Sequence, residues 1–342
     1  MDFSVQLGSG RTVIYKKNDG IVLNEPTKIA YTRTPIGKEK PNKKCKYKTE
    51  VIAVGAAADK MQDRADKSVI IESPVVSGRI ADLPLAKKCF TETFKKISGH
   101  LALSRACLFT VPCSLTAFEI NDYKSVAYAA GVDSVEFIPN VIAGAYALGA
   151  DITGPTAVMY VNIGESGTDI AVITFAGILA GGTIDDGGAA ATRAVHEFIE
   201  HKHKITISCD QAERAKNECA TLLLNNEISF KVKGVDSETG IPKEVWFTGM
   251  DCYKVLLPIY SRIAKAILQV CNDCKPDVVG DLKSGAIFVG GRASNPTGLR
   301  EFLTMNLDMN VCLNADSVNA VIIGAGRLLN NRVLLKRIIR AN

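Results

Sequence analysis

The stretch VQLGSGRT, from Val5 to Thr12, reads as a buried strand that ends in a glycine-rich turn. Glycines let the backbone approach a ligand closely and expose its N–H groups, so such a turn can hold a phosphate. Turns of this kind usually have a carboxylate where this strand has the neutral Gln6. The stretch therefore predicts a phosphate-binding turn with an amide at a normally charged position.

The chain repeats this pattern once. FSVQLGSGRTVIYKKNDGI, from Phe3, aligns with MYVNIGESGTDIAVITFAGI, from Met159, and pairs Gln6 with Asn162 and Gly8 with Gly164. Each copy has a strand, a glycine-rich turn and a second strand, which is typical of a β-hairpin. A single long-period duplication favours two similar α/β halves over a solenoid. We expect the two turns to face each other across a cleft and to hold a phosphate chain from both sides.

Length and composition indicate a folded α/β protein. With 342 residues, 47% of them hydrophobic, the chain can bury a large core in two domains or one large unit. A formal charge of +5, from 41 basic and 36 acidic residues, is mild, so no nucleic acid partner is expected. No run approaches the roughly 18 to 20 apolar residues of a membrane span, and MDFSVQLG does not read as a signal peptide. We therefore expect a cytoplasmic protein.

Two segments have helical periodicity. AFEINDYKSVAYAAG, from Ala117, ends at Gly131, a typical helix stop. Its expected core positions are Phe118, Tyr123, Val126, Ala127 and Ala130. CYKVLLPIYSRIAKAILQVC, from Cys252, is a longer amphipathic helix that Pro258 should bend.

Several longer motifs resemble those of the MreB bacterial actins, within the superfamily of actin and the heat-shock-chaperone ATPases. They include GIVLNEPTKIA (20–30), VIAVGAAADKM (51–61), GRIAD (78–82) and FTVPCSLTAFE (109–119). The similarity continues through the second glycine-rich hairpin to AGRLLNN (325–331), so it covers nearly the whole chain. It implies an actin-like ATPase fold, with two duplicated α/β halves around a central nucleotide cleft.

The resemblance also implies four subdomains. Their expected bounds are 1–31, 75–141 and 315–342 for IA, 32–74 for IB, 142–184 and 247–314 for IIA, and 185–246 for IIB.

By the same resemblance, the cleft binds ATP or ADP with Mg²⁺. The residues that the resemblance assigns to nucleotide binding lie in the two phosphate turns, in a later Gly-Gly turn, in one helical segment and around a late glycine pair. They are Gln6, Gly8, Ser9, Gly10, Arg11, Thr12, Asn162, Gly164, Glu165, Ser166, Gly167, Thr168, Gly187, Gly188, Glu213, Lys216, Gly290, Gly291 and Arg292.

Three carboxylates of the family pattern are amides in this chain. Gln6 replaces the aspartate of D-L-G-T-A-N-T, Asn162 that of D-I-G-G-G-T-T, and Asn140 the glutamate that acts on the attacking water. An amide can bind a water but cannot take its proton, and losing a general base slows a reaction by about 10² to 10⁴. Two lost charges also weaken the hold on Mg²⁺. The pattern leaves ATP binding open and predicts weak or absent hydrolysis.

Other residues of the phosphate turns change the charge of the site. Glu165 should repel a triphosphate unless it points away. Arg11 is expected to supply a compensating cation or to pair with Glu165, and Arg292 to crowd the purine side.

Three surface segments are candidates for contacts. The Lys-rich residues 38–48 lie in an insertion after Thr32 and read as a solvated loop. Leu101 and Leu103 stand where the family has an apolar, membrane-touching loop. RLLNNRVLLKRIIRAN, at 327–342, predicts a basic amphipathic helix suited to an anionic membrane or a partner groove.

Three functions remain open. The resemblance favours a cytoskeletal protein that self-associates into filaments at the inner membrane surface, alone or with a paralogous bacterial actin, and acts in cell shape. A sugar or acid kinase of the same superfamily would need a carboxylate base, which the cleft motifs lack. A non-polymerising pseudo-ATPase that serves as a scaffold is the third.

Overall fold

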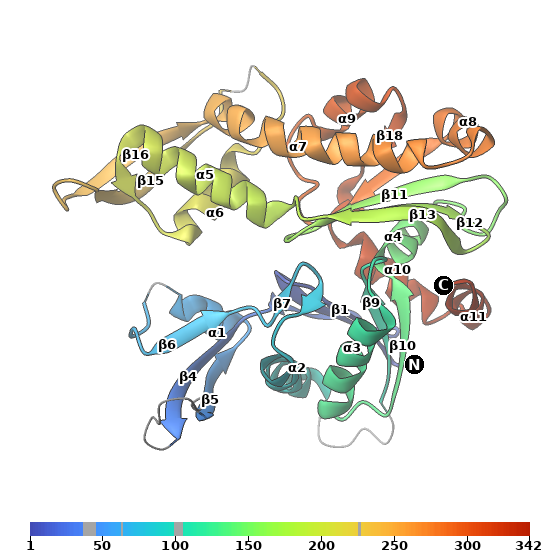
Figure 1. Cartoon of the computed structure of the whole chain (residues 1–342), viewed down its shortest axis with the longest axis horizontal. Coiled ribbons are helices and arrows are strands. Elements are labelled where there is room, and N and C mark those ends of the chain that lie inside the picture. Colours follow the sequence, from blue (N-terminus) through green and yellow to red (C-terminus); the bar gives the residue numbers. More distant parts are fainter. Residues whose placement is uncertain (37–45, 63, 99–104, 225–226) are drawn as a thin grey trace. The chain divides into compact units, whose positions relative to one another are not determined.

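The computed structural model describes residues 1–36, 46–62, 64–98, 105–224 and 227–342 (Figure 1). The chain forms two compact units, Met1–Val111 with Leu115–Phe137, and Pro112–Ser114 with Ile138–Asn342. The first unit is built mainly around a five-stranded sheet of order β10-β9-β1-β2-β3, and the second around one of order β13-β12-β11-β17-β18. In each sheet, two antiparallel hairpin pairs are followed by a parallel pair, β1 with β9 in the first unit and β11 with β17 in the second, as the duplication predicted. The four subdomain bounds stay a prediction.

The central sheet of the first unit starts from the first phosphate turn. β1 pairs antiparallel with β2 and parallel with β9, and β2 pairs antiparallel with β3. Its strands are β1 (Phe3–Leu7), β2 (Arg11–Lys16), β3 (Gly20–Pro26), β9 (Ala106–Val111) and β10 (Ser134–Pro139). Buried aromatic rings from the sheet and from α2 (Leu83–Ser98) fill the core, with Phe90 5.5 Å from both Phe94 and Phe109. This core fixes β1, which carries Gln6.

A smaller sheet of order β5-β4-β6 and a short hairpin complete the first unit. Their elements are β4 (Ile29–Ile36), β5 (Lys46–Val54), α1 (Ala56–Met61), β6 (Val69–Glu72), β7 (Val75–Val76) and β8 (Arg79–Ile80). β4 pairs with β5 from Ile29↔Val54 to Ile36↔Lys46. The end of the Lys-rich segment is therefore a strand and not a loop, because 46–48 belong to β5. Its residues 38–45 lie outside the described residues, as do Leu101 and Leu103.

The helix α3 (Ala117–Ala129) forms where periodicity predicted it. Thr116 and Glu119 make a capping box at its start, and Gly131, at φ +80°, follows its end. Tyr123, Val126 and Ala127 are buried, but Phe118 is 75% exposed. Its prediction as a core residue is wrong, because Phe118 lies in the first turn, on the solvent side of the helix.

The central sheet of the second unit is covered on both faces (Figure 1). It consists of β11 (Val158–Ile163), β12 (Thr168–Thr174), β13 (Gly177–Ile184), β17 (Ala286–Gly290) and β18 (Asn310–Cys312). On one face packs α4 (Asn140–Ala147), which in turn contacts α10 (Ala320–Leu328). On the other face packs the long α7 (Gly249–Asn272), which continues through Pro258. Because side chains alternate along a strand, Tyr160 and Asn162 of β11 face α4, while Val161 and Ile163 face the α7 side.

The remaining elements of the second unit surround this sheet. They are α5 (Gly188–His203), β14 (Ile205–Thr206), α6 (Cys209–Cys219), β15 (Ser229–Asp236), β16 (Pro242–Thr248), α8 (Pro276–Ser284), α9 (Leu299–Leu307), the 3₁₀ helix η1 (Ala315–Asn319) and α11 (Arg332–Ala341).

The helix α11 has the basic amphipathic pattern that the sequence predicted, and its apolar side packs against the second unit. Leu335 and Ile338 are buried against the unit. Arg337 donates to the backbone oxygen of Thr153 at 3.1 Å. The Asn342 side chain donates to Ala176 O at 3.0 Å and accepts from Ile178 N at 3.2 Å. The helix therefore docks on its own unit and leaves mainly its basic side to solvent.

Candidate functional site

The two glycine-rich turns close with the same backbone hydrogen bond. Gly8 N donates to Arg11 O at 3.0 Å, and Gly164 N donates to Gly167 O at 2.8 Å. Each turn joins two antiparallel strands, so the predicted repeat of a β-hairpin is confirmed. The first turn belongs to the first unit and the second turn to the second unit.

The first turn is held by neighbouring loops. Ser73 Oγ donates to Ser9 O at 2.8 Å, and Gly78 N donates to Ser9 Oγ at 3.2 Å. Thr27 N donates to Gly10 O at 3.0 Å, and the hydroxyls of Thr12 and Thr27 are hydrogen-bonded at 2.9 Å. These contacts fix the turn in one conformation.

Arg11 lies along β3 in this turn. Its Nε donates to Asn24 Oδ1 and its Nη2 to Asn24 O, each at 2.5 Å. The pairing of β2 with β3, which sets Arg11 opposite Pro26, explains this direction. The expectations that Arg11 acts as a phosphate cation or as the partner of Glu165 stay predictions.

The second turn packs against the start of α5. A Cβ on Gly187 would lie 2.6 Å from Gly164 O and 2.8 Å from Gly167 N, so only a glycine fits at 187. Thr168 Oγ1 donates to Asp186 O at 2.6 Å. On α7, Arg262 holds the Asp186 carboxylate with two hydrogen bonds of 2.6 and 2.8 Å. The Gly187 turn is thereby fixed against the second phosphate turn.

The late glycine pair also lies against this turn. Gly291 has a φ of +99°, and a Cβ there would lie 2.3 Å from Ile163 O and 2.8 Å from Asn162 Oδ1. Gly290 pairs with Asn162 across the parallel strands. The backbone at 290–291 therefore packs directly on the residues that lead into the second turn.

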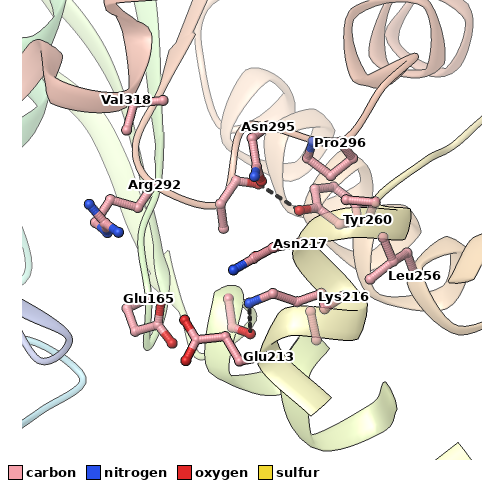
Figure 2. Close-up of a pocket in the computed structure, with 14 residues that line it drawn as sticks. Glu165, Glu213, Lys216, Asn217, Leu256, Tyr260, Arg292, Asn295, Pro296 and Val318 are labelled. Carbon is pink, nitrogen blue, oxygen red and sulfur yellow. Dashed lines mark hydrogen bonds between the residues drawn. The ribbon is translucent and has the colours of Figure 1, made fainter. Parts of the chain in front are cut away.

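A cavity of about 160 Å³ opens beside the second turn, entirely within the second unit (Figure 2). Five residues from the predicted set line it: Glu165, Gly188, Glu213, Lys216 and Arg292. Glu165 and Glu213 point to the same end of the cavity, and Leu256, Tyr260 and Pro296 form the other end. The cavity thus has a polar end with two carboxylates and a more apolar end.

The cavity walls are held by buried hydrogen bonds. Lys216 is only 9% exposed, and its Nζ donates to Gly188 O at 3.2 Å and to Thr192 Oγ1 at 2.8 Å. Tyr260 Oη donates to Ala293 O at 2.6 Å. Lys216 therefore ties α6 to the first turn of α5.

Replacing Lys216 by Met should lower stability by about 1 to 3 kcal/mol, the usual loss for a buried hydrogen bond to a charged group. The methionine keeps the length of the side chain but leaves Gly188 O without the ammonium donor. Thermal unfolding would measure the loss. Lys254→Met, at an exposed position of α7, should change stability by less than about 0.5 kcal/mol. Equal effects of the two substitutions would contradict this role of Lys216.

The sequence did not predict several lining residues: Asn217, Ala220, Leu256, Tyr260, Ala293, Asn295, Pro296 and Val318. Asn217 and Ala220 could have been predicted from their spacing, because they follow Glu213 by four and seven residues and residues three or four apart share a helix face. Tyr260 and Val318 follow no motif, and only the tertiary fold brings them here.

Asn140, the first residue of α4, lies beside a buried carboxylate. Its Nδ2 donates to Asp169 Oδ2 at 3.3 Å, and Thr183 Oγ1 donates to Asp169 Oδ1 at 2.7 Å. A carboxylate therefore lies next to the amide that begins α4. Burial, and secondly the charge of Asp169, raise the pKa of Cys113 to about 12.

Comparison with solved structures identifies the fold as actin-like. The chain matches MreB5 of Spiroplasma citri bound to ADP with a TM-score of 0.87 at 24% identity, over 98% of this chain and 97% of that one. It matches MamK in a double helical filament with a TM-score of 0.76 at 17% identity, over 96% and 98% of the two chains.

The family follows from the sequence relatives. The family model described as MreB/Mbl protein matches residues 1–337. The cell shape-determining protein MreB of Escherichia coli (strain K12) is 26% identical over 331 residues, 96% of this chain and 93% of that protein. Mbl of Bacillus subtilis (strain 168) is 26% identical over 334 residues, 96% of each chain. The chain belongs to the MreB/Mbl family, so the resemblance that the motifs predicted is confirmed.

Proposed function

We propose that the chain self-associates into actin-like filaments that act in cell shape, and that its second unit binds an adenine nucleotide. Relatives along nearly its whole length are named cell shape-determining proteins, and MamK, of the same fold, forms a double helical filament. MreB5 of Spiroplasma citri has been solved with ADP and with AMPPNP. These likenesses support the proposal for this chain.

The observation that carries nucleotide binding is the cavity of the second unit. Residues predicted from separate segments meet around it: Glu165 from the phosphate turn, Glu213 and Lys216 from α6, and Arg292 from the late loop. Carboxylates accept hydrogen bonds from sugar hydroxyls, and the apolar end, with Leu256 and Pro296, suits a base. The residues present therefore fit a nucleoside.

The chain's own donors fit magnesium less well. Within the described part of the chain, no group of three or more His, Cys, Asp or Glu side chains is placed to hold a metal. Asn162 is buried and supplies an amide where the family has a carboxylate. Mg²⁺ keeps several waters and binds phosphate oxygens, so we expect the ion to arrive with the nucleotide. Its role would be to neutralise phosphate charge.

Sedimentation of the purified protein with and without Mg·ATP, with electron microscopy of the pellets, tests assembly. We expect filaments in the pellet. If filaments form only with ATP, the nucleotide still controls assembly despite the amides at 6, 140 and 162. If filaments also form without ATP, assembly is independent of the nucleotide. No assembly in either condition would contradict filament formation and favour the non-polymerising scaffold, which the loss of the three carboxylates keeps plausible.

A fluorescent ATP analogue tests the cavity separately. Glu213→Ala removes a lining carboxylate and should weaken binding about tenfold, the effect of one or two hydrogen bonds. Glu218→Ala, an exposed position on the same helix, should leave the affinity unchanged. Equal affinities for wild type and Glu213→Ala would place the nucleotide elsewhere.

We further propose that the filaments lie against the inner membrane, alone or together with a paralogous bacterial actin. In the parts of the chain that the structure describes, no helix has the length and apolar character to cross a bilayer. The exposed basic residues of α11, among them Arg332, Lys336 and Arg340, favour contact with anionic lipid headgroups. Co-sedimentation with anionic vesicles, compared with neutral vesicles, checks this.

A further inference from the structure

The small sheet of the second unit has an edge strand that no further strand covers in the part of the chain that the structure describes. The sheet order is β14-β15-β16, and β16 pairs with β15 alone, from Pro242↔Val235 to Thr248↔Ser229. The hairpin of β15 and β16 projects from the unit, at the left of Figure 1. An uncovered edge strand presents unpaired N–H and C=O groups, which pair readily with a strand of another chain.

The hydrogen bonds of the hairpin indicate which backbone groups of β16 are free. Two of them stand at the ends of the paired strands: Gly249 N donates to Ile228 O at 2.7 Å, and Asp236 N donates to Ile241 O at 2.9 Å. In an antiparallel pair, hydrogen-bonded positions alternate with non-bonded ones. Counted from both ends, the backbone of Val245 faces β15, whereas the N–H and C=O groups of Glu244 and Trp246 point away from it.

The free part of this edge is short and symmetric. Pro242, the first residue of β16, has no N–H group. Thr248, the last residue, donates its N–H to Asp251 Oδ2 at 3.2 Å. Among the described residues, the free N–H groups on this edge are therefore those of Glu244 and Trp246, one on each side of the middle residue of the strand.

A second copy of β16 matches this edge. When two such strands run antiparallel about a two-fold axis at Val245, Glu244 of each copy lies opposite Trp246 of the other. Each of these pairs then exchanges both of its N–H···O bonds, so all the free N–H groups are used. A two-fold contact needs a surface that is complementary to itself, and this edge is.

The side chains fit the same register. Trp246 is 56% exposed, Lys231 Nζ lies 5.3 Å from the centre of its ring, and the Glu244 carboxylate lies 3.1 Å from the same Nζ. Residues that are directly paired across strands share a face of the sheet. The Trp246 side chain of one copy would thus lie next to the Glu244 carboxylate of the other. An indole N–H donates and a carboxylate accepts, so this contact is favourable.

Other registers fit less well. A shift of two residues in one direction sets Glu244 opposite Glu244 of the second copy, and like charges directly opposite each other are destabilising. The same shift in the other direction sets Glu244 opposite Thr248, whose N–H is already bonded to Asp251. The register about Val245 also brings the half-buried Val245 side chains of the two copies together on the inner face of the sheet.

We propose that two copies of this chain pair edge to edge through β16, antiparallel about Val245. The contact involves none of the residues that line the nucleotide cavity. It goes beyond the proposed filament, because a two-fold contact closes on itself and does not add subunits in a row. It does not depend on nucleotide binding either, so we expect it with and without ATP.

Cross-linking through Val245→Cys tests this register. Directly opposite residues at a non-hydrogen-bonded antiparallel position have Cα atoms about 4.5 Å apart, within the range for a disulfide. Under mild oxidation with copper phenanthroline, Val245→Cys should give about tenfold more dimer on a non-reducing gel than Thr206→Cys, the matched control. Thr206 is exposed on β14, at the opposite edge of the sheet. Wild type gives the background from the ten native cysteines.

Variants of the edge, each added to Val245→Cys, separate pairing through β16 from any other contact. Glu244→Pro removes an N–H that faces away from β15, a position where edge strands accept proline. The dimer should then fall to the control level. Glu244→Gln keeps the N–H and should retain about half of the dimer or more, since an exposed ion pair contributes little.

A charge reversal gives a second test, which also serves if thermal scans show that Glu244→Pro is unfolded. Trp246→Glu, again added to Val245→Cys, sets two carboxylates opposite each other in each pair, so the dimer should be lost. Adding Glu244→Lys places opposite charges in both pairs and should restore the dimer. A residue that served only the fold of its own chain would not show this rescue.

Equal dimer yields for Val245→Cys and Thr206→Cys would overturn the proposal. So would a folded Glu244→Pro or Trp246→Glu variant that cross-links as well as its parent, because another surface would then join the copies. Sedimentation of the same samples keeps this proposal apart from the filament. Dimers that never pellet leave the β16 contact standing and contradict the filament, whereas filaments without the specific cross-link contradict the β16 contact alone.

Discussion

Replacing Gly324 by Ala should lower the free energy of unfolding by about 3 to 5 kcal/mol, at the upper end of overpacking effects. A Cβ at this position would lie 1.8 Å from Ala143 O and 2.7 Å from its carbonyl carbon. Both are backbone atoms of α4, so a side-chain rotation cannot relieve the clash. The two helices α4 and α10 must separate. Because Asn140 begins α4, its contact with Asp169 should be lost as well.

Gly280→Ala is the matched control for this prediction. Gly280 lies within the helix α8, and a Cβ there would meet nothing within 4 Å. An alanine in a helix with free space should stabilise the protein by about 0.5 to 1 kcal/mol. Thermal and denaturant unfolding of the two variants should therefore move in opposite directions. Similar small shifts for both would mean that α4 and α10 adapt to the extra methyl group.

Gly187→Ala should reduce affinity for an ATP analogue about 100-fold or more. Its Cβ would lie 2.6 to 2.9 Å from three backbone atoms of the second phosphate turn, Gly164 O, Gly167 N and Glu165 O. The turn would have to move, and with it the Glu165 end of the cavity. A displacement of this kind removes several contacts together, which is why we expect about 2.7 kcal/mol or more of lost binding energy.

Gly182→Ala is a suitable comparison, because a Cβ there meets only Val270 Cγ2 at an ordinary 3.8 Å. It should bind the analogue as wild type does. Titration by fluorescence, at a temperature where both variants are folded, measures the difference. Wild-type affinity in Gly187→Ala would show that the second turn does not set the nucleotide contacts.

The sequence predicted the fold through patterns that local chemistry determines. The two glycine-rich hairpins, the family motifs and the ends of α3 follow from turn residues and periodicity. The direction of Arg11 could not be predicted, because it depends on the pairing of β2 with β3. The exposure of Phe118 depends on which side of its helix meets the core.

Asp169 shows a signal that the sequence did contain. A four-residue turn fixes the pairing of the two strands of a hairpin, and strict alternation then places residue 169 opposite 162 on the same face. Its contact with Asn140 could not be predicted in the same way, because it depends on how α4 packs on the sheet. Lining residues such as Tyr260 and Val318 were beyond prediction for the same reason.

The docking of α11 guides where a fluorescent reporter should be attached for imaging in cells. The Asn342 side chain bridges Ala176 and Ile178 at the β12–β13 turn, so a bulky fusion after this residue would strain that attachment. The turn at 237–240 between β15 and β16 is exposed, and Gly240 has open space around it. Exposed hairpin tips tolerate inserted domains well. A reporter inserted in that turn should leave both the cavity and α11 as they are.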